Sequence, residues 1–197
     1  ALSGHVYVDG EELTQKNITE RIDLGLALVP EDRQRDGLVQ SMTVGQNLSL
    51  AHLSNLVRRL FIHNSSEEKE VAKKIVDVRV KTSGPGALIT SLSGGNQQKV
   101  VIGKVLMTKP KAILLDEPTR GIDVGAKSEV FTLLADQAKK GMAVLFATSE
   151  IGEALHSATR IVVMRRGHFV AEFIPKKTTR EQVMAAANEE TKKGKGK

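Results

Sequence analysis

The stretch SLSGGNQQKVVIGKVLMTKPKAILLDEPTRGID, Ser91–Asp123, decides the fold. It opens with a small polar turn, Ser93-Gly94-Gly95, in which the serine is a favourable N-cap and the glycines allow a backbone to approach a ligand closely. The following run, Asn96–Met107, is typical of a helix. Because the free N–H groups at the start of a helix attract anions, the turn is a candidate phosphate site.

An apolar strand, Ala112–Leu115, comes next and leads directly into Asp116 and Glu117. Its continuous β-favouring run indicates a central parallel strand that is buried on both faces. Acidic residues at the carboxyl end of such a strand lie where open α/β sheets bind ligands. One carboxylate there can hold Mg²⁺ through water, and its neighbour can orient or deprotonate an attacking water.

Three motifs in this order resemble those of the ATP-binding cassette (ABC) ATPases. Leu92–Val100 (LSGGNQQKV) resembles the signature motif, Ala112–Pro118 (AILLDEP) resembles Walker B with its catalytic glutamate, and Thr119–Asp123 (TRGID) resembles the D-loop. The alternative is an ordinary glycine turn, core strand and acidic turn. The agreement of three motifs in order and spacing favours the resemblance.

The opening stretch, Leu2–Gly10 (LSGHVYVDG), predicts a strand and a hairpin turn. It is similar to the strand that ABC domains carry shortly after the helix following the P-loop. The P-loop pattern G-x-x-x-x-G-K-[ST] does not occur in the chain; Gly121–Ser128 comes near it, but its glycines are too close and an alanine precedes the lysine. We therefore expect a fragment that begins after the P-loop helix; the alternative is a protein that never had one.

A strand at Leu26–Val29 is followed by the charged stretch Pro30–Leu38 (PEDRQRDGL). By itself this stretch reads equally well as a polar surface loop. It stands where ABC domains have the Q-loop, and Glu31 occupies the position at which many members carry a glutamine. It resembles the second cassette of the monosaccharide importers of the ribose, galactose and xylose type.

Helices are predicted on both sides of this stretch. Asn17–Gly25 suggests a short capped helix, and Met42–Leu50 starts with Thr43 as N-cap and Gln46 in a capping box. Apolar residues recur at helical spacing in two further groups; these are Leu53, Leu56, Val57, Leu60 and Phe61, and then Val71, Ile75 and Val78.

Beyond the D-loop, Lys127–Lys140 predicts a helix that ends at Gly141, and Met142–Ala147 a buried strand. Ser149 follows, where many ABC ATPases have the switch histidine. The remaining expected elements are a helix at Ile151–Ser157, a hairpin of Arg160–Met164 and His168–Phe173, and a last helix, Arg180–Ala187, capped by Thr178.

Composition limits the class of protein. Hydrophobic residues make up 40% of the 197 residues but aromatics only 3%, so the core must be aliphatic, and cysteine is absent, which fits a reducing compartment. Four of the six net positive charges come from the tail Thr191–Lys197. Basic patches with interleaved aromatics are missing, so we expect no nucleic-acid partner. A Lys/Gly tail can touch nucleic acid or anionic lipid, but a solvated, disordered end is the favoured reading.

The resemblance implies an α/β fold, the P-loop NTPase-like ABC nucleotide-binding domain, incomplete at its N-terminus. It has a parallel sheet flanked by helices, antiparallel hairpins and an inserted helical subdomain. The implied division is residues 1–31 as part of the ATP core, 32–90 as the helical subdomain, 91–188 as the signature, Walker B and switch part, and 189–197 as a disordered Lys-rich tail.

The resemblance also implies the site, in which each ATP lies between one cassette's P-loop and the signature of its partner. The contacts to ATP of the other cassette fall to Ser93, Gly94, Gly95 and Gln97. Asp116 would bind Mg²⁺ through water and Glu117 would be the catalytic carboxylate, while Asp123 would signal across the dimer. Glu31 and Ser149 would be degenerate switch positions that take part in catalysis.

The implied function is ATP hydrolysis that energises the import of a sugar. The partners would be a second cassette, transmembrane permease subunits and, indirectly, a periplasmic sugar-binding protein, with the cassette in the cytoplasm, on the inner face of a bacterial cell membrane. Without a P-loop the isolated chain should bind ATP poorly and be inactive. The alternatives are an ABC ATPase of translation or DNA repair and a non-catalytic interaction module.

Overall fold

The computed structural model describes residues 4–52, 57–58, 61–62 and 64–188. Two compact units divide the chain between Ala147 and Thr148, and each is described by itself. The expected Lys-rich tail at 189–197 lies outside the described residues, as do Leu53, Leu56 and Leu60 of the first apolar group. The four-part division expected from the sequence is a functional one and stays a prediction.

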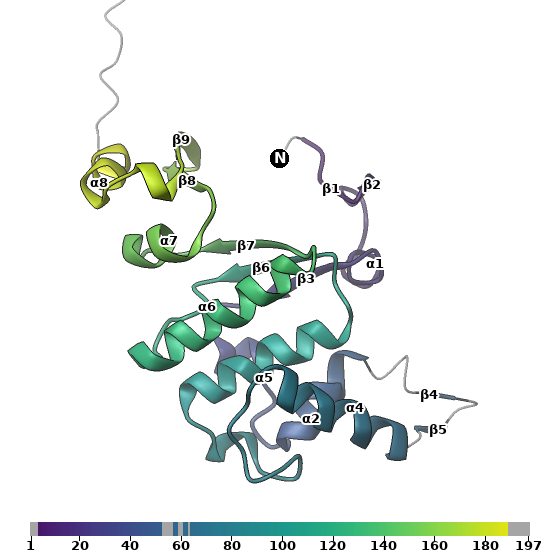
Figure 1. Cartoon of the computed structure of the whole chain (residues 1–197). Helices are drawn as coiled ribbons and strands as arrows, with labels where there is room; N and C mark the ends of the chain where they lie inside the picture. Colours follow the sequence, from purple (N-terminus) through teal and green to yellow (C-terminus); the bar gives the residue numbers. More distant parts are fainter. Residues whose placement is uncertain (1–3, 53–56, 59–60, 63, 189–197) are drawn as a thin grey trace, which may run out of the picture. The chain divides into compact units, whose positions relative to one another are not determined.

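A parallel sheet organises the first unit. Its strands are β3 (Leu26–Val29), β6 (Ala112–Asp116) and β7 (Ala143–Ala147), side by side in the order β3-β6-β7 (Figure 1). In the register Val29 pairs with Leu115, and Asp116 pairs with Ala147. The carboxyl ends of the three strands therefore meet at one edge, and this confirms the α/β class with a parallel sheet.

One face of this sheet is covered by two helices, α5 (Gly94–Met107) and α6 (Val124–Lys139). Val29, Ile113 and Leu115 point into a single aliphatic core with residues of both helices. On the other face, Leu28 is 59% exposed and Leu145 is 67% exposed. The expectation that the central strand is buried on both faces is wrong here, because burial alternates along β6.

A layer of helices packs on the far side of α5. It consists of α2 (Val44–Ser49) and α4 (Asn64–Asp77), with a short 3₁₀ turn, η2 (Leu50–His52), after α2 and another, η3 (Ile89–Ser91), before the signature. The predicted capping box of Thr43 and Gln46 is present at the start of α2. Gly103 lets α2 approach, because a Cβ there would lie 2.7 Å from the Leu48 side chain.

The predicted hairpin at the amino end consists of β1 (Tyr7–Val8) and β2 (Glu11–Glu12). Its turn residues, Asp9 and Gly10, have φ angles of +53° and +81°, as a two-residue hairpin turn requires. Helix α1 (Ile18–Asp23) follows, with the expected Asn17 cap and Gly25 at φ +96° just after it.

The helix expected around Val57 and Phe61 is wrong. The described residues there form two short antiparallel strands, β4 (Val57–Arg58) and β5 (Phe61–Ile62), in which Val57 pairs with Ile62. Val, Ile and Phe favour strands, and apolar residues four positions apart, as at Val57 and Phe61, are compatible with two antiparallel strands as well as with a helix.

The second unit contains α7 (Ile151–Ser157), the hairpin β8 (Ile161–Arg165) and β9 (His168–Phe173), a 3₁₀ turn η4 (Pro175–Lys177) and α8 (Arg180–Asn188). Its small core includes Ile161, Val163 and Val183. The expected order of elements is confirmed. The cap of the last helix is Thr179 rather than Thr178, because the Thr179 hydroxyl accepts a hydrogen bond from the amide of Gln182.

Candidate functional site

The predicted acidic pair lies at the carboxyl edge of the sheet. Asp116 is the last residue of β6 and is exposed, and Glu117 follows it with φ +44°. The Glu117 amide donates to the carbonyl of Ala147, at 2.9 Å, and the Glu117 carbonyl accepts from the amide of Arg120, at 3.1 Å. The chain therefore makes a tight turn directly after the strand, and both carboxylates stand at the sheet edge rather than in the core.

A cavity of about 700 Å³ opens at this edge. It brings together Asp116 and Glu31, two of the residues singled out from the sequence. Glu31 forms an ion pair with Arg120 of the D-loop segment. The residues that line the cavity come from the end of β3, the charged stretch after it and the loop after β6; they are Leu28, Pro30, Glu31, Asp32, Arg33, Gln34, Arg35, Asp36, Asp116 and Arg120.

The charged stretch after β3 is not a plain loop, because it contains a π-helix, η1 (Arg33–Gly37). Asp32 caps it and accepts hydrogen bonds from the amides of Gln34 and Arg35, at 3.0 and 3.1 Å. At its other end, the ammonium group of Lys104 on α5 donates to the Gly37 carbonyl, and burial lowers the pKa of Lys104. This element was not expected from the sequence, although an aspartate cap and a closing glycine mark its ends.

Ser93 is the N-cap residue of α5, as predicted, but its hydroxyl does not cap the helix. It accepts a hydrogen bond, at 3.0 Å, from the side-chain amide of Asn96, whose oxygen in turn accepts from the Lys81 amide, at 2.9 Å. Ser93 is exposed. Because the oxygen is engaged as an acceptor, the hydroxyl proton remains available to donate to a group outside the helix.

The glycines of the signature lie close to protein neighbours. A Cβ on Gly94 would lie 2.7 Å from the Arg33 guanidinium, and a Cβ on Gly95 would lie 2.4 Å from the Cβ of Ala126 at the start of α6. From the sequence alone, glycines were expected here because a ligand approaches closely. The contact with Ala126 already requires a glycine at position 95, whereas the Arg33 side chain beside Gly94 is flexible at its end. Their part in binding a nucleotide stays a prediction.

Gln97 and Asp123 have structural roles in this unit. Gln97 is 6% exposed, and its amide donates to the Ile89 carbonyl at 3.3 Å. Asp123 caps α6, and its carboxylate accepts from the Ala126 amide at 2.9 Å. A nucleotide contact by Gln97 and signalling by Asp123 stay predictions, and the inward position of Gln97 gives its contact no support.

Ser149 belongs to the second unit, where it is exposed in the turn before α7. The neighbouring Thr148 organises this turn. Its hydroxyl accepts from the Glu150 amide at 3.1 Å and pairs with the Glu153 carboxylate at 3.0 Å. Ser149 is thus at the start of a helix, and its part in catalysis stays a prediction.

The donor set at the edge suits Mg²⁺ only with help from a ligand. Within the described part of the chain, no group of three or more His, Asp and Glu residues could hold a metal ion alone. Mg²⁺ is commonly held by one or two carboxylates together with waters and phosphate oxygens. An exposed Asp116 beside a polar cavity fits that mode, and the chain's residues are therefore compatible with Mg²⁺ bound together with a nucleotide.

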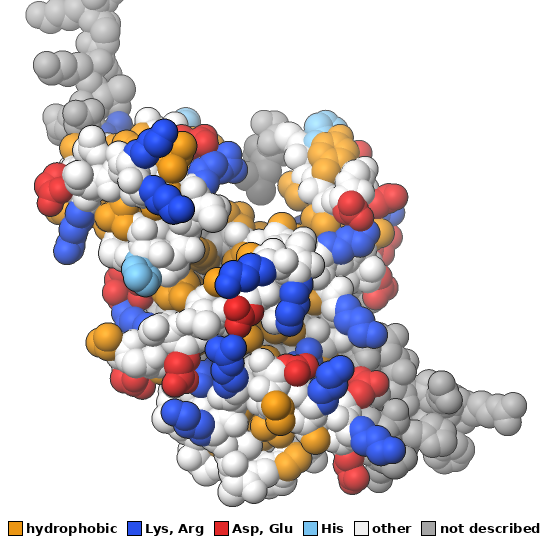
Figure 2. All heavy atoms as spheres, viewed as in Figure 1, with side chains coloured by type: hydrophobic (Ala, Val, Ile, Leu, Met, Phe, Trp, Pro, Cys, Tyr) orange, Lys and Arg blue, Asp and Glu red, His pale blue; other side chains and the backbone are white. Residues whose placement is uncertain are grey.

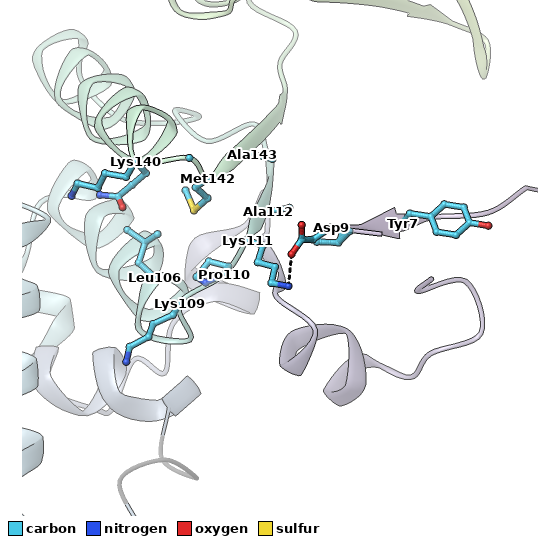
Figure 3. A pocket seen from close by; sticks show the side chains of 13 residues that line it. Tyr7, Asp9, Leu106, Lys109, Pro110, Lys111, Ala112, Lys140, Met142 and Ala143 are labelled. Atoms are coloured by element: carbon cyan, nitrogen blue, oxygen red, sulfur yellow. Dashed lines mark hydrogen bonds and ion pairs between the residues drawn. The ribbon is translucent and has the colours of Figure 1, made fainter. Parts of the chain in front are cut away.

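A second cavity, of about 710 Å³, lies at the opposite edge of the sheet, where β6 and β7 begin (Figure 3). Three lysines, Lys109, Lys111 and Lys140, contribute to its lining, and Lys111 forms an ion pair with Asp9 at 2.7 Å. The hydrogen bond and charge of Lys111 lower the pKa of Asp9. Parallel sheets place ligands at the carboxyl ends of their strands, so the cavity at Asp116 is the candidate site.

The surface carries mixed charge. On the face shown in Figure 2, Lys and Arg side chains are interspersed with acidic and apolar ones, without a continuous basic patch. None of the helices in the described ranges combines the length and the hydropathy that crossing a bilayer requires.

The comparison with known proteins identifies the family. The sequence pattern of the ABC transporter family matches residues 1–120. The chain belongs to this family. It is 43% identical over 185 residues to the xylose import ATP-binding protein XylG of Pseudomonas syringae pv. tomato and 42% identical to XylG of Escherichia coli (strain K12). These alignments cover 94% and 93% of this chain but 35% and 36% of the relatives, so the chain spans about a third of their length.

Solved structures agree on the fold. The dimeric post-hydrolysis state of the ATP-binding cassette MJ0796 bound to ADP and Pi matches with a TM-score of 0.71 at 22% identity, covering 88% of this chain and 74% of that one. The cbiO1 protein of Clostridium perfringens, part of the ABC transporter complex cbiONQ, matches with a TM-score of 0.73 at 25% identity, covering 88% and 67%. The expected ABC nucleotide-binding fold is confirmed.

Proposed function

We propose that this chain is the signature and Walker B part of an ATP-hydrolysing cassette that energises the import of a monosaccharide. The observation that carries the proposal is the placement of Asp116 and Glu117 at the carboxyl edge of the sheet, beside a cavity shared with Glu31. The names of the relatives point to xylose or a similar sugar as the transported substrate.

The positions of the residues are compatible with the proposed roles. Asp116 is exposed at the cavity and would hold Mg²⁺ through water, and Mg²⁺ would neutralise charge on the phosphates. Glu117, one residue further, would orient and polarise the attacking water. The Ser93 hydroxyl and the amides of Gly94 and Gly95, at the positive end of the α5 dipole, would contact the γ-phosphate of ATP held by a partner cassette.

Three other expected site residues, Glu31, Asp123 and Ser149, lie between helices and strands. Glu31 would sense the nucleotide from the cavity, Asp123 would relay its state across the cassette pair, and Ser149 would stand in for the switch histidine. A serine is uncharged and shorter than an imidazole, so hydrolysis at this site would be slower than at one that carries the histidine. Gln97, which is buried, would stabilise the signature segment through its hydrogen bond to the Ile89 carbonyl.

The bare face of the sheet supports the proposal that this chain works within a larger protein. Leu28 and Leu145 are mostly exposed there, and parallel sheets normally have both faces covered. A further segment that carries the P-loop would cover this face and supply the phosphate cradle. The isolated chain would therefore be inactive as an ATPase.

The partners would be a second cassette, which faces this one head to tail, and the permease subunits of a transporter. A periplasmic sugar-binding protein would act indirectly, and nucleic acid is not an expected partner. The protein would lie in the cytoplasm, at the inner face of the cell membrane. The aspartate of the D-loop and the exposed Ser93 would then form part of the cassette interface.

One alternative has an observation in its favour. The ion pair of Glu31 with Arg120 occupies the carboxylate at the Q-loop position, and no P-loop pattern occurs in the sequence. A non-catalytic cassette half that only binds its partners would show both features. An ABC ATPase of translation or DNA repair is less well supported, because the relatives are named for xylose import.

Deletion of the gene that encodes this chain tests the transport function. Uptake of radiolabelled xylose, ribose and galactose is compared in the parent, the deletion strain and the deletion strain that expresses the Glu117→Gln protein. We expect the deletion to abolish uptake of at least one sugar and the variant not to restore it. Restoration by the variant would favour the non-catalytic module, and unchanged uptake of all three sugars in the deletion strain would contradict a role in importing them.

A further inference from the structure

Glu117 has a backbone conformation that an L-amino acid adopts at a cost. Its φ angle of +44° lies in the left-handed region. Two hydrogen bonds hold it there, from its amide to the Ala147 carbonyl and from the Arg120 amide to its own carbonyl. The direction of the carboxylate therefore depends on the turn that ends at Arg120 staying in place.

The Arg33 side chain donates hydrogen bonds to the backbone of that turn and of the residue after it. One terminal nitrogen of its guanidinium, Nη1, donates to the Arg120 carbonyl at 2.8 Å, and the other, Nη2, donates to the Gly121 carbonyl at 3.3 Å. The two contacts join η1 to the D-loop segment, almost ninety positions later in the chain. The planar fork of an arginine presents two nitrogens in fixed directions to two neighbouring acceptors, whereas a lysine presents all its donors from a single nitrogen.

The surroundings of Arg33 fix the direction of its fork. A Cβ on Gly94 would lie 2.7 Å from Nη2, so the signature helix leaves room for the guanidinium and no more. The Nε atom is buried and has no hydrogen-bond partner among the described residues. A buried donor without a partner lowers stability, so Arg33 keeps this position at a cost in stability.

Glu31 reinforces the same turn through the Arg120 side chain. The stretch after β3 therefore contacts the D-loop segment in two ways. Glu31 forms an ion pair with the Arg120 side chain, and Arg33 donates hydrogen bonds to the Arg120 and Gly121 carbonyls. The hydrogen bonds of Arg33 act on the backbone that bonds to Glu117, whereas the ion pair acts on a side chain that is 67% exposed. Arg33 thus has the more direct effect on Glu117.

We propose that Arg33 is a positioning residue for Glu117: it fixes the Glu117–Gly121 turn and thereby the catalytic carboxylate. This rests on the proposed function of Glu117 as the group that polarises the attacking water. Nη1 and Nη2 of Arg33 each donate to a backbone carbonyl, so we expect the residue to act mainly on the rate of hydrolysis. Its loss would move the carboxylate relative to the water and change nucleotide binding much less.

The kinetic test uses the intact protein that carries this chain, with Arg33→Ala, Arg33→Lys and the control Arg21→Ala. Arg21 on α1 also donates to two backbone carbonyls, those of Lys16 at 2.8 Å and Thr14 at 3.3 Å, but it is not among the residues that line the cavity at Asp116. We expect Arg33→Ala to lower kcat about tenfold or more and to leave KM for ATP within about twofold, because small displacements of catalytic groups cost rate. Arg33→Lys should retain part of the rate, since a lysine ammonium can restore part of the contact from its single nitrogen, and Arg21→Ala should match the parent.

Two further readouts separate positioning from loss of folding. Guanidinium chloride at non-denaturing concentration should restore part of the kcat of Arg33→Ala but not of Glu117→Gln. Hydrogen exchange without nucleotide should be faster at the Arg120 amide in Arg33→Ala than in the parent or in Arg21→Ala. This second readout does not depend on ATP hydrolysis.

Several outcomes would overturn the proposal. They are an unchanged kcat in Arg33→Ala, a rise in KM as large as the fall in kcat, a failure of guanidinium to rescue, and unchanged exchange at Arg120. If the Glu117→Gln variant hydrolyses ATP as fast as the parent protein, the proposed function of Glu117 is wrong. The hydrogen-exchange experiment still decides whether Arg33 fixes the turn.

Discussion

Gly95 and Ala126 face each other where α5 and α6 begin, so closely that a Cβ on Gly95 would lie 2.4 Å from that of Ala126. This contact sets two helix starts side by side, the start that carries Ser93 and the start that Asp123 caps. The signature and the D-loop are thus parts of one packed surface. A displacement of the signature segment should therefore also displace the D-loop segment, and the reverse, because close-packed interiors transmit displacement.

Replacement of Gly95 by alanine should destabilise the protein. The added methyl group must displace α6, and overpacking of this kind typically costs about 1–3 kcal/mol in the free energy of unfolding. Urea denaturation measures the change. The matched control is Gly152→Ala, also in a helix, where a Cβ would meet nothing within 4 Å; it should be neutral or stabilising by up to about 1 kcal/mol. Equal effects of the two changes would refute the packing argument.

Glu129→Gln should destabilise the protein at neutral pH and lose this effect in acid. The Lys99 side chain is 3% exposed, and its ammonium group donates to the Glu129 carboxylate and to the Arg79 carbonyl. The hydrogen bond from Lys99, and then its charge, lower the pKa of Glu129 below the usual 4.5. Since Glu129 is partly solvated, we expect a loss of about 1–2 kcal/mol at pH 7.

The pH dependence has a definite sign. A carboxylate with a lowered folded-state pKa contributes stability that is complete above its unfolded-state pKa and is lost as the pH falls through the folded-state pKa. The difference between parent and Glu129→Gln should therefore be constant from about pH 7 to 5.5 and shrink below pH 4.5. The control Glu68→Gln, an exposed change on α4, should show neither effect. A difference that grows towards low pH would contradict the assigned ion pair.

The isolated chain should bind Mg-ATP weakly. Its sequence contains no P-loop pattern, whose amides and lysine supply most phosphate contacts in this class of site. Isothermal titration calorimetry with the 197-residue chain should give a Kd weaker than about 100 μM, that is, less than about 5.5 kcal/mol of binding free energy. Micromolar affinity would show that the described cavity supplies the phosphate contacts itself.

Much of the fold could be predicted from the sequence because its elements are locally encoded. The strand at Ala112–Asp116 and the helix at Ile151–Ser157 were expected within one residue of their bounds. Continuous apolar runs, caps such as Thr43 and the turn at Asp9 and Gly10 are short-range signals. They specify an element without knowledge of what packs on it.

Features that depend on distant neighbours could not be predicted. The exposure of Leu28 and Leu145 depends on which layer covers the sheet, and no local pattern encodes it. The packing reason for Gly94 became visible only with Arg33 beside it. The strands at Val57 and Phe61 were misread because the same spacing fits a helix and a hairpin.

The site was predicted in part. The sequence placed Asp116 at a strand end, and the structure puts it in one cavity with Glu31. The inward position of Gln97 could have been found, since it stands three and four residues before the buried Val100 and Val101, on the same face of α5. The hydrogen bonds from Arg33 to the D-loop segment could not be predicted, because the residues that they connect are too far apart in the sequence for a local pattern.

Single-turnover hydrolysis of ATP by the intact protein, compared between the parent and Glu117→Gln, tests the central claim most directly. Because Glu117 stands at the sheet edge one residue after Asp116, its amide variant should retain Mg-ATP binding within about threefold and hydrolyse it at least about a hundredfold more slowly. A variant that binds ATP equally well and hydrolyses it at the parent rate would contradict the account.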